Sequence, residues 1–185
     1  MYKVYVKGFV GNLGTKVLIK NKYEELSKRF SEEYIKVLIK SICETLEDGD
    51  NPSLSILDGI ADVEKVMKGG ILSALWKICE RNKWGLVFNL REIPILQGTV
   101  EIANYFDINP YRLLSDNVFI FVSDRDYNNE EYYNIFKIGE IRNTKKRVRI
   151  DGESEAFLTK DYKDEIDIIL PKYTKNYENK NRKIV

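Results

Sequence analysis

The sequence ADVEKVMKGGILSALW, residues 61–76, joins an apolar-leaning segment to a glycine pair and to the start of a helical pattern. After the pair, apolar residues recur with the spacing of one helix face, at Ile71, Leu72, Leu75, Ile78 and Cys79. Gly69 and Gly70 allow the backbone to turn sharply and another group to approach closely. The stretch therefore predicts a strand over 61–66, a tight turn and a long amphipathic helix.

The glycine pair has two interpretations. The free N–H groups of the first helical turn, together with the positive end of the helix dipole, would suit a phosphate group. The two glycines would also suit close packing of the turn against a neighbouring segment, which is the commoner interpretation of an isolated Gly-Gly. The residues alone leave both open.

A second glycine-rich turn lies near the start of the chain. Residues 2–7 alternate in polarity like a strand, and GFVGNLGT, residues 8–15, follows them and precedes a helical pattern. Glycines placed between a strand and a helix resemble a phosphate cradle. The spacing, however, fits neither the dinucleotide-binding fingerprint nor the P-loop, whose lysine is missing. On its own the turn is a weak signal.

The rest of the chain alternates helical and strand patterns. Ser31 is a good N-cap for a helix, Thr99 is expected to cap another that ends at Phe106, and Gly85 is expected to end the helix after the glycine pair. We expect helices over 17–27, 32–46, 53–60, 70–84 and 99–106, and strands over 2–7, 61–66, 86–90, 118–122, 133–141, 147–150 and 156–158. This order predicts an α+β fold, a mixed β-sheet covered by helices in two or three layers.

The composition indicates an ordinary folded domain. A chain of 185 residues with 43% hydrophobic residues can bury a core, and we expect one domain over residues 1–170 with a basic, flexible tail over residues 171–185. The chain has no long apolar run and its start lacks the apolar stretch of a signal peptide, so no membrane segment is expected. Cys43 and Cys79 fit free thiols. We therefore expect a cytoplasmic protein.

Charge is unevenly spread over the chain. Its net charge is +1, but residues 172–185 carry five basic residues and one acidic residue. Such a tail could contact nucleic acid, although a solvated, frayed terminus is the commoner interpretation. Because the remaining chain offers no basic patch signal, nucleic acid is not expected as a partner.

Histidine is absent from the sequence. This excludes His-based metal sites, nucleophiles paired with His and a His general base. The acidic residues Asp124 and Asp126 and the acidic segment 161–167 are interpreted as solvated. The tyrosines Tyr127, Tyr132 and Tyr133 are interpreted as an amphipathic surface edge, with a binding face as the alternative. No catalytic residue and no metal ligand is assigned.

The run KGGILSALWKICE, residues 68–80, resembles the glycine-pair helix in the C-terminal domain of the aminoimidazole ribonucleotide (AIR) synthetase superfamily. That superfamily also holds the hydrogenase-maturation protein HypE, selenophosphate synthetase and thiamine-monophosphate kinase. Four further segments resemble landmarks of the same domain, at 7–15, 93–95, 113–117 and 136–141. The ordered set is most similar to the HypE branch.

The resemblance implies an AIR synthetase C-terminal-like domain. In full-length members, an N-terminal domain precedes it, supplies much of the ATP and metal site, and forms the dimer. We expect this chain to begin at the first strand of the C-terminal domain. The family motif His-Asp-x-Thr is replaced before the glycine pair, where Lys65 reverses the charge of an expected acid. The chain also ends without the C-terminal cysteine through which HypE-type proteins work.

Three hypotheses follow. The chain is a stand-alone, catalytically degenerate domain that binds a phosphate-containing ligand such as ATP, or a partner protein, or it forms a homo-oligomer. Alternatively, it is one subunit of a split ATP-dependent enzyme, whose separate ATP-binding domain shares a site with Asn12, Asp62, Glu64, Lys65 and Lys68. In the third, it is an unrelated α+β binding module. The expected cofactor-binding residues are those of the two turns, which would enclose a phosphate if the turns meet in space: Gly11, Asn12, Gly14, Thr15, Lys68, Gly69 and Gly70.

Overall fold

The computed structural model describes residues 1–47, 57–127, 132–160 and 163–176. The described strands form one seven-stranded mixed sheet in the order β2-β4-β1-β5-β3-β6-β7. Neighbouring strands are antiparallel, except for β3 and β6, which are parallel. The strands are β1 (Lys3–Lys7), β2 (Ile60–Lys65), β3 (Gly85–Asn89), β4 (Phe119–Ser123), β5 (Ile135–Arg142), β6 (Arg147–Asp151) and β7 (Ser154–Phe157).

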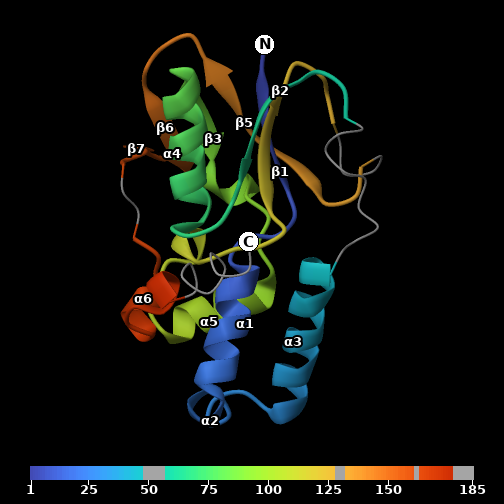
Figure 1. Ribbon diagram of the computed structural model, residues 1–185, viewed down its shortest axis with the longest axis vertical. Coiled ribbons are helices and arrows are strands. Elements are labelled where there is room, and N and C mark those ends of the chain that lie inside the picture. Colours follow the sequence, from blue (N-terminus) through green and yellow to red (C-terminus); the bar gives the residue numbers. More distant parts are fainter. Residues whose placement is uncertain (48–56, 128–131, 161–162, 177–185) are drawn as a thin grey trace.

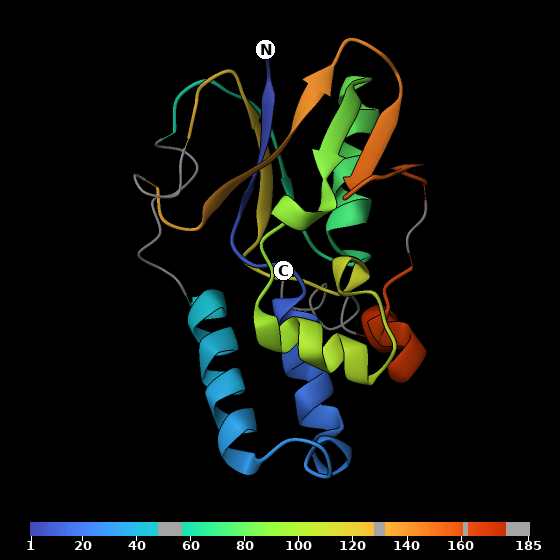
Figure 2. The same ribbon diagram turned by 180° about the vertical axis from the view of Figure 1, so that it is seen from behind.

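The helices fall into two groups (Figures 1 and 2). Helix α4 (Gly70–Asn82) lies along one face of the sheet, whereas the other α-helices gather beyond one end of the strands. This second group contains α1 (Asn12–Asn21), α2 (Tyr23–Leu26), α3 (Glu32–Glu47), α5 (Gln97–Tyr105) and α6 (Ile166–Ile169). Two short 3-10 helices, η2 (Leu90–Glu92) and η3 (Pro110–Arg112), lie in the connections. The α+β fold predicted from the sequence, a mixed sheet with layers of helices, is confirmed.

Three hydrophobic clusters stabilise this arrangement. One fills the space between the sheet and α4 and includes Leu75 and Phe88. A second holds the other helices together around Leu18 and Ile35. The third lies around Tyr5 and includes Phe121 and Tyr127. The turn after β1 connects the sheet to the helical group.

The helices that follow the predicted caps differ in detail. Helix α1 begins at Asn12 rather than at residue 17, because Gly11 takes a left-handed conformation (φ 74°) that starts the helix immediately after the turn. Ser31 does cap α3, since its Oγ accepts a hydrogen bond from the N–H of Tyr34 at 3.2 Å. Thr99 does not cap α5. It lies inside that helix and is fully buried.

The ends of α4 and the segment before β2 also differ from expectation. Helix α4 ends at Asn82, because the next residue, Lys83, has a left-handed backbone conformation (φ 57°). Gly85 does not end this helix but begins β3. A Cβ at Gly85 would lie 2.0 Å from the carbonyl oxygen of Thr144, so this glycine permits a close backbone approach. Residues 53–56 of the helix expected over 53–60 lie outside the described residues, and Ile60 begins β2. Within the described residues, no helix has both the length and the hydropathy needed to cross a bilayer.

Candidate functional site

Both glycine turns pack against η3, a short segment that follows α5. A Cβ added to Gly11 would lie 3.3 Å from the carbonyl oxygen of Pro110, and one added to Gly70 would lie 2.3 Å from that of Tyr111. The two turns are therefore neighbours across adjacent residues of η3. Protein atoms fill the space against each glycine, as the close-packing interpretation of the glycine pair requires.

In the front turn, the backbone donors are hydrogen-bonded within the chain. The N–H of Gly11 donates to Oγ of Ser115 at 2.8 Å, and the N–H of Gly14 donates to the carbonyl oxygen of Leu114 at 2.8 Å. Asn12 is fully buried, and its amide exchanges hydrogen bonds of 2.9 and 3.0 Å with the backbone of Asp116. The hydroxyl of Thr15 donates to the carbonyl oxygen of Gly11 at 2.8 Å.

In the second turn, the carboxylate of Asp164 lies at the N-terminus of α4. Its Oδ2 accepts a hydrogen bond from the N–H of Gly69 at 2.8 Å, and its Oδ1 accepts from Leu114 at 3.2 Å and from Ile166 at 3.1 Å. The N–H of Gly70 donates to the carbonyl oxygen of Met67 at 3.1 Å. A carboxylate of the same chain thus accepts the N–H of the residue that immediately precedes α4.

Asp164 corrects one expectation from the sequence. Segment 161–167 was expected to be solvated, but Asp164 is only 1% exposed and Glu165 is 8% exposed. Burial raises the pKa of Asp164 to about 6, against the opposing effect of its three backbone hydrogen bonds. Because the segment is rich in acidic residues, its sequence did not indicate that one of them is buried. The only sequence signal for burial is the apolar group Ile166, Ile169 and Leu170, which packs in the helical cluster.

A second contact holds the Asp164 segment in place. Arg112 of η3 forms an ion pair with Glu165, with Nη1 and Oε1 3.3 Å apart. The N–H of Glu165 also donates to the carbonyl oxygen of Arg112 at 3.3 Å. Further along, Thr174 is 1% exposed, and its N–H donates to Oδ1 of Asp167 at 2.9 Å. The start of this segment is therefore joined to the second glycine turn through Asp164 and to η3 through Glu165.

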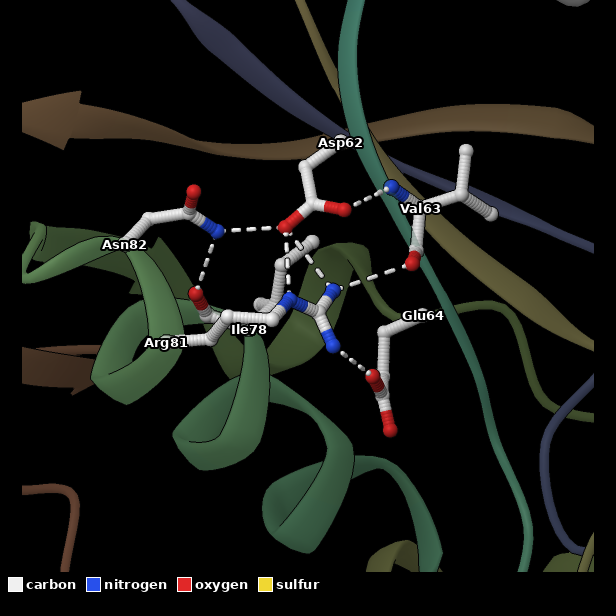
Figure 3. Close-up of polar contacts among 6 residues, drawn as sticks. All are labelled: Asp62, Val63, Glu64, Ile78, Arg81 and Asn82. Carbon is white, nitrogen blue, oxygen red and sulfur yellow. Dashed lines mark hydrogen bonds and ion pairs between the residues drawn. The ribbon is translucent and has the colours of Figure 1, made fainter.

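The polar residues of β2 are hydrogen-bonded to α4 (Figure 3). Nε and Nη2 of Arg81 lie 2.9 and 2.8 Å from Oδ2 of Asp62, and Nη1 lies 2.8 Å from Oε2 of Glu64. Burial acts to raise the pKa of Asp62, but hydrogen bonds from Asn82 and Arg81 outweigh it and leave that pKa below its usual value. Lys65 is paired with Asp116 at 2.7 Å.

The predicted cofactor-binding residues are thus gathered on either side of η3, and most of their donors have partners within the chain. Lys68 is partly buried beside the second turn. Among the described residues, no group of three or more acidic or cysteine side chains could hold a metal ion. Binding of phosphate by these residues stays a prediction.

Comparison with known proteins places the fold. The sequence matches no family model and no curated protein. HypE from E. coli matches with a TM-score of 0.64 and 12% identity, over 89% of this chain and 51% of that one. A HypE structure in complex with ATP has a TM-score of 0.62 and 13% identity, over 86% of this chain and 50% of that one. Thiamine monophosphate kinase from Aquifex aeolicus has a TM-score of 0.55 and 13% identity, over 84% and 51%.

These matches establish the fold. The chain has the AIR synthetase C-terminal-like fold that the resemblance implied, and it spans about half the length of each solved structure. Since HypE and the kinase both match at similarly low identity, the likeness does not assign the chain to the HypE branch.

Proposed function

We propose that this chain is a binding domain with an AIR synthetase C-terminal-like fold, which acts through a partner protein and does not hydrolyse ATP on its own. The observation that supports the proposal is the carboxylate of Asp164 at the N-terminus of α4, where it accepts hydrogen bonds from Gly69 and Leu114. In the front turn, Oγ of Ser115 accepts a hydrogen bond from the N–H of Gly11.

A phosphate group at either turn would have to replace these acceptors. Near α4 it would also bring a second negative charge next to Asp164, and like charges in a buried place repel strongly. Both turns thus serve to join segments of the chain, which favours a scaffold over a nucleotide site.

Titration with a phosphate ligand that carries no base tests the proposal. We expect magnesium pyrophosphate to bind the purified chain no more tightly than a Kd of about 100 μM, equivalent to about −5.5 kcal/mol, in isothermal titration calorimetry. We also expect no release of phosphate from ATP. Tighter binding that is lost when Gly69 is replaced by alanine would contradict the proposal.

A split ATP-dependent enzyme is the second candidate. The observation in its favour is that this chain matches about half of a HypE structure crystallised with ATP. An ATP-binding half supplied as a separate chain would then complete the site. Phosphate release that requires both chains, and disappears when either is omitted, would support this candidate. Failure of such a chain to co-purify with this one would count against it.

The proposal keeps phosphate binding in one form only. The residues concerned are those expected from the sequence: Gly11, Asn12, Gly14, Thr15, Lys68, Gly69 and Gly70. Such binding would require Asp164 and Ser115 to leave their present positions, for example when a partner displaces residues 164–174. An Asp164→Ala variant that binds pyrophosphate where the wild type does not would support such a displaced form. Equal absence of binding in both proteins would argue against it.

A further inference from the structure

A groove of about 380 Å³ lies between α3 and the residues that immediately precede β5. No glycine of the two turns lines it. Figure 1 shows the C-terminal end of α3 directed toward the sheet beside α1. Phe9, Leu96 and Tyr133 supply apolar walls, and Ser41, Glu44 and Thr45 of α3 supply polar groups. The volume is within the range of about 300–1,000 Å³ that is typical of small-molecule sites.

Hydrogen bonds fix the helix that forms one wall of the groove. Nδ2 of Asn12 donates to Oγ1 of Thr45 at 3.4 Å, and Nδ2 of Asn117 donates to the carbonyl oxygen of Thr45 at 3.3 Å. These two contacts join the last turns of α3 to the segments beside the front turn. Ser41 and Glu44, on the same side of the helix, are held in position as a result.

The opposite wall is equally well supported. The N–H of Gly8 donates to the carbonyl oxygen of Asn134 at 2.9 Å, which sets the position of the residues beside Tyr133. The ring of Phe9 packs edge-on against Phe136, with ring centroids 5.8 Å apart. Aromatic rings on a fixed backbone can stack on a flat ligand with little loss of conformational entropy.

The polar groups of the groove favour a ligand that donates hydrogen bonds. Within the described part of the chain, the side chains of Ser41 and Glu44 make no hydrogen bond or ion pair. The lining includes a carboxylate and no basic residue, so it disfavours an anion. Tyr133 is 69% exposed and leaves its ring accessible. An aromatic ring with an N–H donor matches all of these features.

We propose that this groove binds a flat aromatic heterocycle that carries an amino group, of the nucleobase class. Its ring would stack on Phe9 and Tyr133, and its amino group would donate to the carboxylate of Glu44. The proposal concerns a different surface from the expected phosphate site, because none of the residues expected to bind phosphate lines the groove, although Phe9 belongs to the front turn.

Nucleosides without phosphate groups test the proposal directly. Adenosine and cytidine carry an exocyclic amino group, whereas 3-methyluridine carries a carbonyl in its place and has no N–H group on its base. We expect isothermal titration calorimetry to show saturable binding of adenosine and cytidine by the wild-type chain, and at least about tenfold weaker binding of 3-methyluridine, because Glu44 can accept but not donate a hydrogen bond.

Variants of the two walls identify the site. Tyr133→Ala is expected to weaken adenosine binding about tenfold through loss of stacking, and Glu44→Gln is expected to remove the discrimination against 3-methyluridine. Glu33→Gln on the same helix and Tyr23→Ala on α2 are the matched controls, and both should bind like the wild type. Both lie outside the lining of the groove.

The proposal would be overturned by equal binding of all three nucleosides, by no binding at millimolar concentration, or by an affinity that Tyr133→Ala leaves unchanged. These results are separate from the pyrophosphate titration, which probes only the glycine turns. Circular dichroism of each variant verifies that a loss of binding is not a loss of fold.

Discussion

Asp164 joins three parts of the chain through a single carboxylate. It accepts backbone hydrogen bonds from the turn before α4, from the segment after η3 and from the start of α6. A buried carboxylate is stable only when such donors surround it. The same residue therefore explains how the C-terminal segment is held against the turn before α4.

The pKa of Asp164 predicts a specific dependence of stability on pH. Because its pKa is raised from 3.8 to about 6 in the folded chain, the folded state keeps this proton longer than the unfolded state does. The contribution of this group to the free energy of unfolding should then fall by up to about 3 kcal/mol as pH rises from about 4 through about 6. Above that range the contribution should be constant. Urea denaturation across this range measures the slope.

Asp164→Ala is the matching variant. It should lack this slope, and at neutral pH it should lose about 1–3 kcal/mol because the N–H groups of Gly69 and Leu114 stay buried without an acceptor. Asp124→Ala, at an exposed position, is the control and should keep the wild-type slope. A difference in stability between the wild type and Asp164→Ala that stays the same from pH 4 to pH 7 would contradict the account.

Two glycines with nearly the same positive φ offer a sharp comparison. Gly70 has φ +64° and Gly152 has φ +61°, so alanine at either position is strained by about 1–2 kcal/mol. At Gly70 the added Cβ would also lie 2.3 Å from the carbonyl oxygen of Tyr111, whereas at Gly152 it meets only the flexible end of Arg91. Thermal denaturation should show Gly70→Ala to be destabilised by more than about 3 kcal/mol and Gly152→Ala by far less. Equal losses would show that Gly70 is not packed against η3.

At the scale of elements, the edge strand β2 is attached to α4 by the side chains of Arg81 and Asn82. Arg81 spans Asp62 and Glu64, which alternate along β2 and so lie on the same side of the strand (Figure 3). Its side chain is 47% exposed, and solvent weakens the charge interactions accordingly. The contact fixes the helix against the edge of the sheet rather than preparing a site for a ligand.

Replacement of Arg81 tests this attachment. Arg81→Ala should lower the free energy of unfolding by about 1 kcal/mol, and Arg81→Lys should restore less than half of that, because an ammonium group cannot reach both carboxylates with paired donors. The loss should shrink at high salt. Lys36→Ala, which removes an exposed ion pair with Glu32, is the control and should have almost no effect. A loss at Arg81 no larger than the loss at Lys36 would contradict the role.

Most elements could be predicted from periodicity and caps, because their signals are local. The helix after the glycine pair and the strands β1, β3 and β4 follow directly from the spacing of their apolar residues. Thr99 was misassigned because a threonine inside a helix can look like a cap. It is buried there, where its hydroxyl donates to the hydroxyl oxygen of Thr15 at 3.1 Å. That contact joins residues far apart in the sequence and has no local signal.

At the scale of the whole molecule, the glycine turns lie where the sheet and the helical group meet. A glycine-rich turn before a helix has the same sequence whether its donors face a ligand or a neighbouring segment. Only the tertiary structure shows that η3, Ser115 and Asp164 occupy this place. The sequence could therefore predict the fold and the position of the candidate site, but not what fills it.

The exchange and chemical shifts of the turn amides test the central claim most directly. In NMR spectra of the isotope-labelled chain, the N–H groups of Gly11, Gly14 and Gly69 should be protected from hydrogen exchange and should not shift when magnesium pyrophosphate is added. Their hydrogen bonds to Ser115, Leu114 and Asp164 predict this result. Saturable shifts of these three amides in the wild-type chain would instead show a working phosphate site, and would contradict the view that both turns are closed.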